Sequence, residues 1–264
     1  MSFAPYTSEQ DKLERFVNSF GTQSFRDQAD RDYIAARLAC RYELFPQFLW
    51  GSHQAIEKYL KAILLYNRVK ATQVGHDLAL ALSLTENLPF KIQLSSRSRK
   101  FIAHLAEVGE FRYIDIPYYV DGYILIDLDL AVWEIRRYCQ VLNIFWEVLP
   151  FEEQKLLDAK WAELAASKTK PRHEFRLQDG LLEKVLDDKR HPSRSALLWH
   201  NPCFGVRKRA TIRAKSHLHA QNPLLYLYPE MLDELVKYVF IPKKLVASYR
   251  KHLAEIKAGT QARP

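Results

Sequence analysis

The feature that most constrains the fold is the apolar pattern between Trp50 and Leu65. Apolar side chains recur there at intervals of three and four residues, at Trp50, Ile56, Tyr59, Leu60, Ile63 and Leu64. Side chains at this period share one face of an α-helix, so the stretch predicts a helix with a continuous buried stripe. On another face Glu57 stands one turn before Lys61, in the favourable order for an ion pair.

The rest of the chain favours the same class of structure. Its 264 residues include only eight Gly, and 48% of them are hydrophobic, which is enough for a sizeable core. Further helices are expected over 27–45, after Asp77, over 95–108 and 121–149, then over 152–166, 177–188, 230–240 and 243–256. We therefore predict an all-α protein. An antiparallel up-and-down bundle would occupy residues 1–150, and a basic, partly irregular helical extension would occupy residues 151–264, with the boundary at Pro150.

Charge is distributed unevenly between these two parts. Residues 1–150 hold 17 Lys and Arg against 18 Asp and Glu, whereas residues 151–264 hold 22 against 13. No acidic residue occurs from Lys189 to Pro229. The basic residues of this window that we expect to contact nucleic acid are Arg190, Arg194, Arg207, Lys208, Arg209, Arg213 and Lys215. Phosphate contacts of this kind add affinity without sequence readout, although a solvated basic loop with no ligand would look the same.

Several classes of protein are disfavoured. No apolar run approaches the roughly 18 residues that a membrane span requires, and the N-terminus lacks the pattern of a secretion signal. The three cysteines are widely spaced, so we expect reduced thiols in a cytoplasmic protein without a structural metal. Phosphate-binding glycine loops and zinc-protease motifs are missing from the sequence, and no cofactor is expected.

Three short motifs, in this order, resemble those of the HEPN family of helical bundles. The first is the run from Gln54 to Leu64, QAIEKYLKAIL, and the second is His76-Asp77-Leu78. The third is Arg112-Tyr113 followed by Asp115, which is similar to an Arg-Tyr-Pro-Asp motif with Ile in place of Pro. The resemblance covers roughly residues 25–148. Each motif also has a purely structural interpretation: Glu57 and Lys61 would form a solvated face, Asp77 would cap a helix, and Arg112 would pair with an acidic neighbour while Tyr113 packs beneath it.

The resemblance implies a protein that acts on RNA or nucleotides, forms a homodimer, and is a metal-independent ribonuclease of a toxin–antitoxin or defence system. Ribonuclease members of the family carry an Arg followed by a His after four to six residues. Arg99 and His104 are the best-placed pair, since an Arg can neutralise phosphate charge and a His can move a hydroxyl proton. Three other pairs fit this spacing: Arg97 with His104, Arg194 with His200, and Arg213 with His219.

Two other functions stay open. In the first, the bundle is a non-catalytic module that dimerises or docks a partner nucleotidyltransferase or antitoxin, while the basic region binds nucleic acid. In the second, the basic region binds DNA and the protein is regulatory. Exposure and proximity of Arg99 and His104 would favour catalysis, whereas salt-dependent binding of duplex DNA without cleavage would favour regulation.

Overall fold

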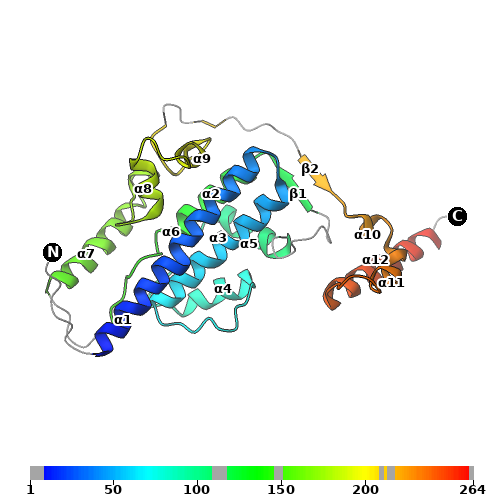
Figure 1. The fold of residues 1–264 in the computed structure, drawn as a ribbon, viewed down its shortest axis with the longest axis horizontal. Coiled ribbons are helices and arrows are strands. Elements are labelled where there is room, and N and C mark those ends of the chain that lie inside the picture. The colour runs from blue at the N-terminus through cyan, green and yellow to red at the C-terminus, as the bar shows by residue number, and fades with distance from the viewer. Residues whose placement is uncertain (1–8, 109–117, 146–150, 208–210, 213–217, 262–264) are drawn as a thin grey trace. The chain divides into compact units, whose positions relative to one another are not determined.

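The computed structural model describes residues 9–108, 118–145, 151–207, 211–212 and 218–261 (Figure 1). Up to Arg136 its elements are α1 (Glu9–Phe20), the π-helical η1 (Gly21–Arg26), α2 (Asp27–Arg41), α3 (Phe45–Tyr66), α4 (Leu78–Leu84), η2 (Thr85–Asn87), α5 (Ser96–Val108), β1 (Tyr118–Asp121) and α6 (Ile124–Arg136). Then follow α7 (Phe151–Ala166), η3 (Arg172–Glu174), α8 (Leu181–Asp187), α9 (Arg194–Leu198), β2 (Leu218–Gln221), α10 (Leu224–Leu227), η4 (Pro229–Met231), α11 (Leu232–Leu235) and α12 (Lys243–Gln261).

The structure is mostly helical, which confirms the predicted class. Within its described residues no helix combines the length and apolar character that a bilayer span requires.

The chain divides into two compact units. The first combines Met1–Glu110 with Tyr123–Lys215, and the second combines Phe111–Gly122 with Ser216–Pro264. The boundary expected at Pro150 lies outside the described residues, so the division into domains 1–150 and 151–264 stays a prediction.

Helix α3 is the centre of the first unit and contacts α2, α4, α5 and α6 (Figure 1). The residues of its predicted stripe that are fully buried are Ile56, Tyr59, Leu60, Ile63 and Leu64. Trp50 lies at the edge of the stripe and is 37% exposed. Because only three residues separate α2 from α3, the two helices form an antiparallel hairpin. The hydrophobic period of the sequence therefore identified the core helix correctly.

Helix α6 is shorter than expected, because it ends at Arg136 and no helix follows it up to Phe145. Two side chains of α7 bond to the backbone beyond it: Lys160 Nζ donates to the Val141 carbonyl at 3.3 Å, and Trp161 Nε1 donates to the Leu142 carbonyl at 3.2 Å. These bonds replace the helical partners that the carbonyls would otherwise need. The helix predicted over residues 121–149 was therefore too long.

A buried arginine ties the segment after α7 to the bundle. The guanidinium of Arg136 is 2% exposed and bonds to Asp30 on α2 and to Glu183 on α8. Asp30 also accepts a hydrogen bond from the Tyr59 hydroxyl at 2.5 Å. Helix α8 thus belongs to the same packed unit as the predicted bundle.

A second buried arginine, Arg37 on α2, makes an equivalent link to α9. It pairs with the carboxylate of Asp129 on α6, and it donates to the backbone carbonyls of Ala196 and Trp199. The same Asp129 accepts a hydrogen bond from the Tyr33 hydroxyl at 2.6 Å. Residues on both sides of the predicted boundary therefore share one buried polar network.

The second unit has a small core of its own. Its buried residues are Leu225, Leu232, Leu245 and Tyr249. The unit also contains an antiparallel pair of four-residue strands, β1 and β2, in the register Tyr118↔Gln221 to Asp121↔Leu218. Neither strand was predicted, since four residues are too short to establish a strand period.

Candidate functional site

Helix α5 carries the predicted catalytic pair. Its N-terminus is capped by Ser95, whose Oγ accepts a hydrogen bond from the Ser98 backbone N–H at 3.2 Å. Phe101, Ile102 and Leu105 are buried in the core of the unit. The basic side chains nearer the start of α5 are exposed.

Arg99 is exposed and lines a pocket of about 460 Å³ in the first unit. The other lining residues are Leu82, Thr85, Glu86, Lys91, Ile92 and Leu94. Arg97, one turn before Phe101, is already paired with the Asp127 carboxylate. Arg99 is thus the better placed of the two arginines to meet a phosphate.

His104 is half-buried and does not line the pocket that Arg99 lines. The two residues are five positions apart on a continuous helix, which separates them by about 7.5 Å along the axis and about 140° around it. One copy of α5 therefore presents Arg99 and His104 in different directions.

The other two predicted Arg–His spacings have different surroundings. Arg194 Nε donates to the Leu186 carbonyl at 3.0 Å, and the ring of His200 stacks on Trp199 at 4.7 Å. Arg213 lies outside the described residues, and His219 lies in β2.

A second polar cluster surrounds Glu57, whose carboxylate is buried on α3. Lys61 Nζ donates to Glu57 Oε1 at 2.6 Å and to the Gly75 carbonyl at 2.7 Å. His76 Nδ1 lies 2.9 Å from Glu57 Oε2, and His53 Nδ1 lies 3.7 Å from the same oxygen. The expected Glu57–Lys61 ion pair is confirmed, but Glu57 is not on a solvated face.

Burial and charge act in opposite directions in this cluster. Burial alone would raise the pKa of Glu57, but hydrogen bonds to Lys61 and His76 outweigh it and lower the pKa below its usual value. Burial lowers the pKa of His53, and the attraction of Glu57 only partly offsets this. The cluster is therefore a carboxylate held ionised beside a buried neutral histidine.

Asp77 has the structural role proposed for it. Its Oδ1 accepts a hydrogen bond from the Leu80 backbone N–H at 2.9 Å, which caps α4. The Arg112-Tyr113 motif and Asp115 lie outside the described residues.

The predicted basic segment is described only in part. Arg190 is exposed, whereas Arg194 is tied to the Leu186 carbonyl as above. Arg207 donates to the carbonyls of Asn201 and Thr211. The segment's remaining basic residues lie outside the described residues; they are Lys208, Arg209, Arg213 and Lys215. Within the described part, Arg190 is thus the member of this set with an exposed side chain and no backbone carbonyl to hold it.

No group of three or more His, Cys, Asp or Glu side chains in the described ranges is placed to hold a metal ion. The three cysteines, Cys40, Cys139 and Cys203, are free thiols.

Comparison with known families agrees with this architecture. The family model of the HEPN domain matches residues 22–148, from η1 through α6 and just beyond it. Residues 22–148 are a HEPN domain. The predicted family is thereby confirmed, and the Gln54–Leu64 motif lies mostly in the C-terminal half of α3, the domain's central helix.

One curated protein with which the chain shares similarity is the RNA polymerase-associated protein RapA of Vibrio atlanticus (strain LGP32). The two are 25% identical over 198 residues, which is 68% of this chain and 20% of RapA. The chain thus spans about a fifth of the length of that protein. No solved structure matches the chain.

The HEPN domain also contains charged residues that sequence reasoning missed. Asp30 and Arg37 on α2 stand seven residues apart, and so do Asp129 and Arg136 on α6. All four are buried. Seven residues are about two helical turns, so two charges at this spacing within an apolar stripe are a signal for buried ion pairs.

Proposed function

We propose that this chain is a cytoplasmic protein that acts on RNA through α5 of its HEPN domain. The observation that carries the proposal is the exposed Arg99 beside Lys91 in an open pocket, on the same helix as His104. Two cations at one opening attract a phosphate group, because ionised donors make the strongest hydrogen bonds to phosphate oxygens.

The chemistry in this proposal is metal-independent cleavage of RNA. Arg99 would neutralise the charge that develops on phosphorus, and His104 would accept the proton of the attacking 2′-hydroxyl. The attack expels the 5′-oxygen of the next nucleotide, which takes up a proton as it leaves. A histidine suits this role, since its usual pKa lies near neutrality.

The direction of the two side chains makes a homodimer part of the proposal. One α5 presents Arg99 and His104 about 140° apart, so one copy alone does not direct both at the same phosphate. Two α5 helices facing one cleft would supply an arginine and a histidine from different directions. The toxin–antitoxin or defence role is the biological setting in which we propose this activity.

A second candidate is an interaction module without catalysis. It is favoured by the finding that His104 does not line the pocket of Arg99. In this case the HEPN domain docks a partner, of which a nucleotidyltransferase or an antitoxin is an example, and the basic segment around Arg190 contacts nucleic acid.

Cleavage of total RNA and of tRNA by the purified chain in EDTA tests the proposal. The variant is Arg99→Ala/His104→Ala, and the control Arg31→Ala/His173→Ala removes the same residue types from positions outside the pocket. Circular dichroism checks that each variant is folded. The proposal is supported if the natural chain and the control cleave RNA and Arg99→Ala/His104→Ala does not. If none of the three proteins cleaves RNA, the interaction module is favoured. If all three cleave it, the assignment of the activity to α5 is contradicted.

A further inference from the structure

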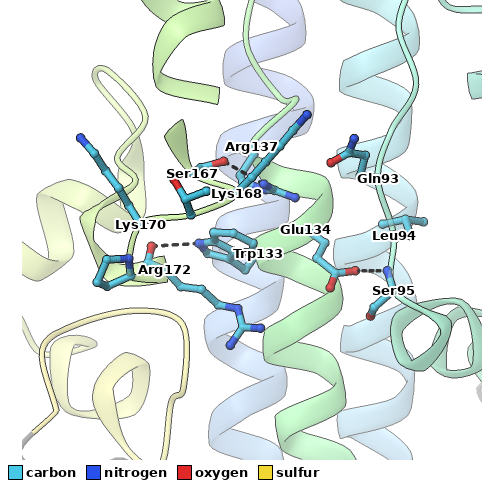
Figure 2. Close-up of a pocket in the computed structure, with 12 residues that line it drawn as sticks. Gln93, Leu94, Ser95, Trp133, Glu134, Arg137, Ser167, Lys168, Lys170 and Arg172 are labelled. Atoms are coloured by element: carbon cyan, nitrogen blue, oxygen red, sulfur yellow. Dashed lines mark hydrogen bonds between the residues drawn. The ribbon is translucent and has the colours of Figure 1, made fainter. Parts of the chain in front are cut away.

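A second pocket of the first unit has the character of an anion site. It has a volume of about 670 Å³ and is formed by three segments: residues 93–95, the end of α6, and residues 167–172 (Figure 2). This volume lies within the roughly 300–1,000 Å³ of typical small-molecule sites. Its charged lining residues are Glu134, Arg137, Lys168, Lys170 and Arg172. Four cations against one carboxylate give the pocket a strong positive potential.

Arg137 is the deepest of these cations. It is only 4% exposed, and its guanidinium lies over the ring of Trp133 at 4.0 Å from the centroid. One of its nitrogens, Nη1, donates to Ser167 Oγ at 2.8 Å, as Figure 2 shows. Its Nε–H is buried and makes no hydrogen bond to any described residue.

The buried charge of Arg137 is only partly compensated among the described residues, by the attraction of the Glu134 carboxylate. It forms no ion pair there, and the nearby carboxylate of Glu134 instead accepts a hydrogen bond from the Ser95 backbone N–H at 2.8 Å. Burial is the largest effect and lowers the pKa of Arg137, and the attraction of Tyr138 and Glu134 only partly offsets it. Proteins pair nearly all buried charges, so a buried arginine with a free donor beside an open pocket indicates that a ligand supplies the partner.

The remaining cations lie at the exposed rim. Lys168, Lys170 and Arg172 follow one another in the turn after α7 and in η3, and all three are exposed. Trp133 Nε1 donates to the Arg172 carbonyl at 3.0 Å, which fixes this turn against α6. The site thus has a buried inner cation and exposed outer ones, an arrangement that suits a doubly charged group at its centre.

We propose that this pocket binds the phosphate group of a nucleotide or of RNA, with Arg137 as its inner ligand. The volume leaves room for a group attached to the phosphate. The pocket shares Leu94 with the one that Arg99 lines but none of its charged residues, so the proposal does not rest on the activity proposed for α5.

The first test measures the Tm of the full chain in sodium phosphate and in sodium chloride at equal ionic strength. We expect phosphate to raise the Tm of the natural chain and to leave that of Arg137→Met unchanged. In chloride, Arg137→Met should unfold at the same or a higher temperature, because the variant removes a buried charge that has no ion-pair partner among the described residues. A purely structural arginine would give a lower Tm. An equal gain in phosphate for both proteins would overturn the proposal.

A second variant keeps the test decisive if Arg137→Met does not fold. Lys168→Gln/Lys170→Gln changes only exposed rim residues, and calorimetry should find phosphate binding about threefold to tenfold weaker. The matched control is Lys155→Gln/Lys184→Gln, which removes the same charge from exposed positions outside the pocket and should bind as the natural chain does. If both double variants weakened phosphate binding equally, the effect would be one of general charge, and the proposed site would be contradicted.

Three probes then identify the source of the phosphate. Titrations compare adenosine, adenosine 5′-monophosphate and a dinucleotide joined by one phosphodiester. Stronger binding of the monophosphate assigns the site to free nucleotides or to RNA 5′-ends, and stronger binding of the dinucleotide assigns it to the RNA backbone. Adenosine binding as well as either phosphate-bearing probe would contradict phosphate recognition.

Discussion

Arg136 and Asp30 are joined by two parallel hydrogen bonds, Nε to Oδ1 at 2.7 Å and Nη2 to Oδ2 at 2.8 Å. Both residues are buried, and both were absent from the predicted core. Glu183 bonds to the same guanidinium at 2.8 and 2.7 Å. This three-residue network connects two helices of the HEPN domain to α8, which follows that domain in the sequence.

Arg136→Met should lower the free energy of unfolding by about 3–5 kcal/mol, because it leaves two carboxylates buried without their cation. Urea denaturation of the full chain measures this change. The matched control is Arg176→Met, which breaks the exposed Arg176–Asp187 pair and should cost no more than about 1 kcal/mol. Equal losses from the two variants would show that the buried network is no more important than a surface pair.

Gly180 should not tolerate alanine, although its φ of −69° is ordinary. A Cβ at this position would overlap Glu183 Oε2 and lie 2.8 Å from Arg136 Nη2, and both groups are held by the buried ion pair. We expect Gly180→Ala to destabilise the protein by about 1–3 kcal/mol in urea. Gly259→Ala is the control, since nothing lies within 4 Å of its Cβ position in α12. If Gly180→Ala left the free energy of unfolding unchanged, the ion pair would have shifted without any loss of stability.

Stability should fall in mild acid because of His53. Burial lowers the pKa of His53 below 6.5, so the unfolded chain binds more protons than the folded one, and stability is lost as pH drops through about 6.5. His53→Phe should flatten this dependence between about pH 7 and 5. The contribution of Glu57, whose pKa is lowered, is present above about 4.5 and is lost only at lower pH. Parallel pH profiles of Tm for the natural chain and His53→Phe would contradict the assignment of this pH dependence to His53.

A fragment of residues 1–150 should be less stable than a fragment of residues 1–207. The shorter fragment lacks Glu183 as a partner of Arg136, and it lacks the Ala196 and Trp199 carbonyls that accept from Arg37. We expect a difference of at least about 3 kcal/mol in urea denaturation. Equal stability would support a domain boundary at Pro150.

Local patterns in the sequence predicted much of this fold. The stripe of α3 and the Asp77 cap of α4 depend on residues close together in the chain, so spacing alone was enough to find them.

What could not be predicted depends on contacts between distant segments. Arg37 is 159 residues from the Ala196 carbonyl, and Glu57 is 19 residues from His76 across a loop. The early end of α6 has the same origin, because α7 supplies hydrogen-bond partners for the carbonyls of Val141 and Leu142, which follow the helix. The pocket at Arg137 likewise needs three segments that only the folded chain brings together.

The most direct test of an RNA-directed function is the affinity of the full chain for a labelled single-stranded RNA, measured at several salt concentrations beside duplex DNA of the same sequence. We predict that RNA binds more tightly than the duplex, that affinity falls as salt rises, and that Arg99→Gln weakens RNA binding whereas Arg31→Gln does not. Equal or tighter binding of duplex DNA, unaffected by Arg99→Gln, would contradict this account and favour a DNA-binding regulator.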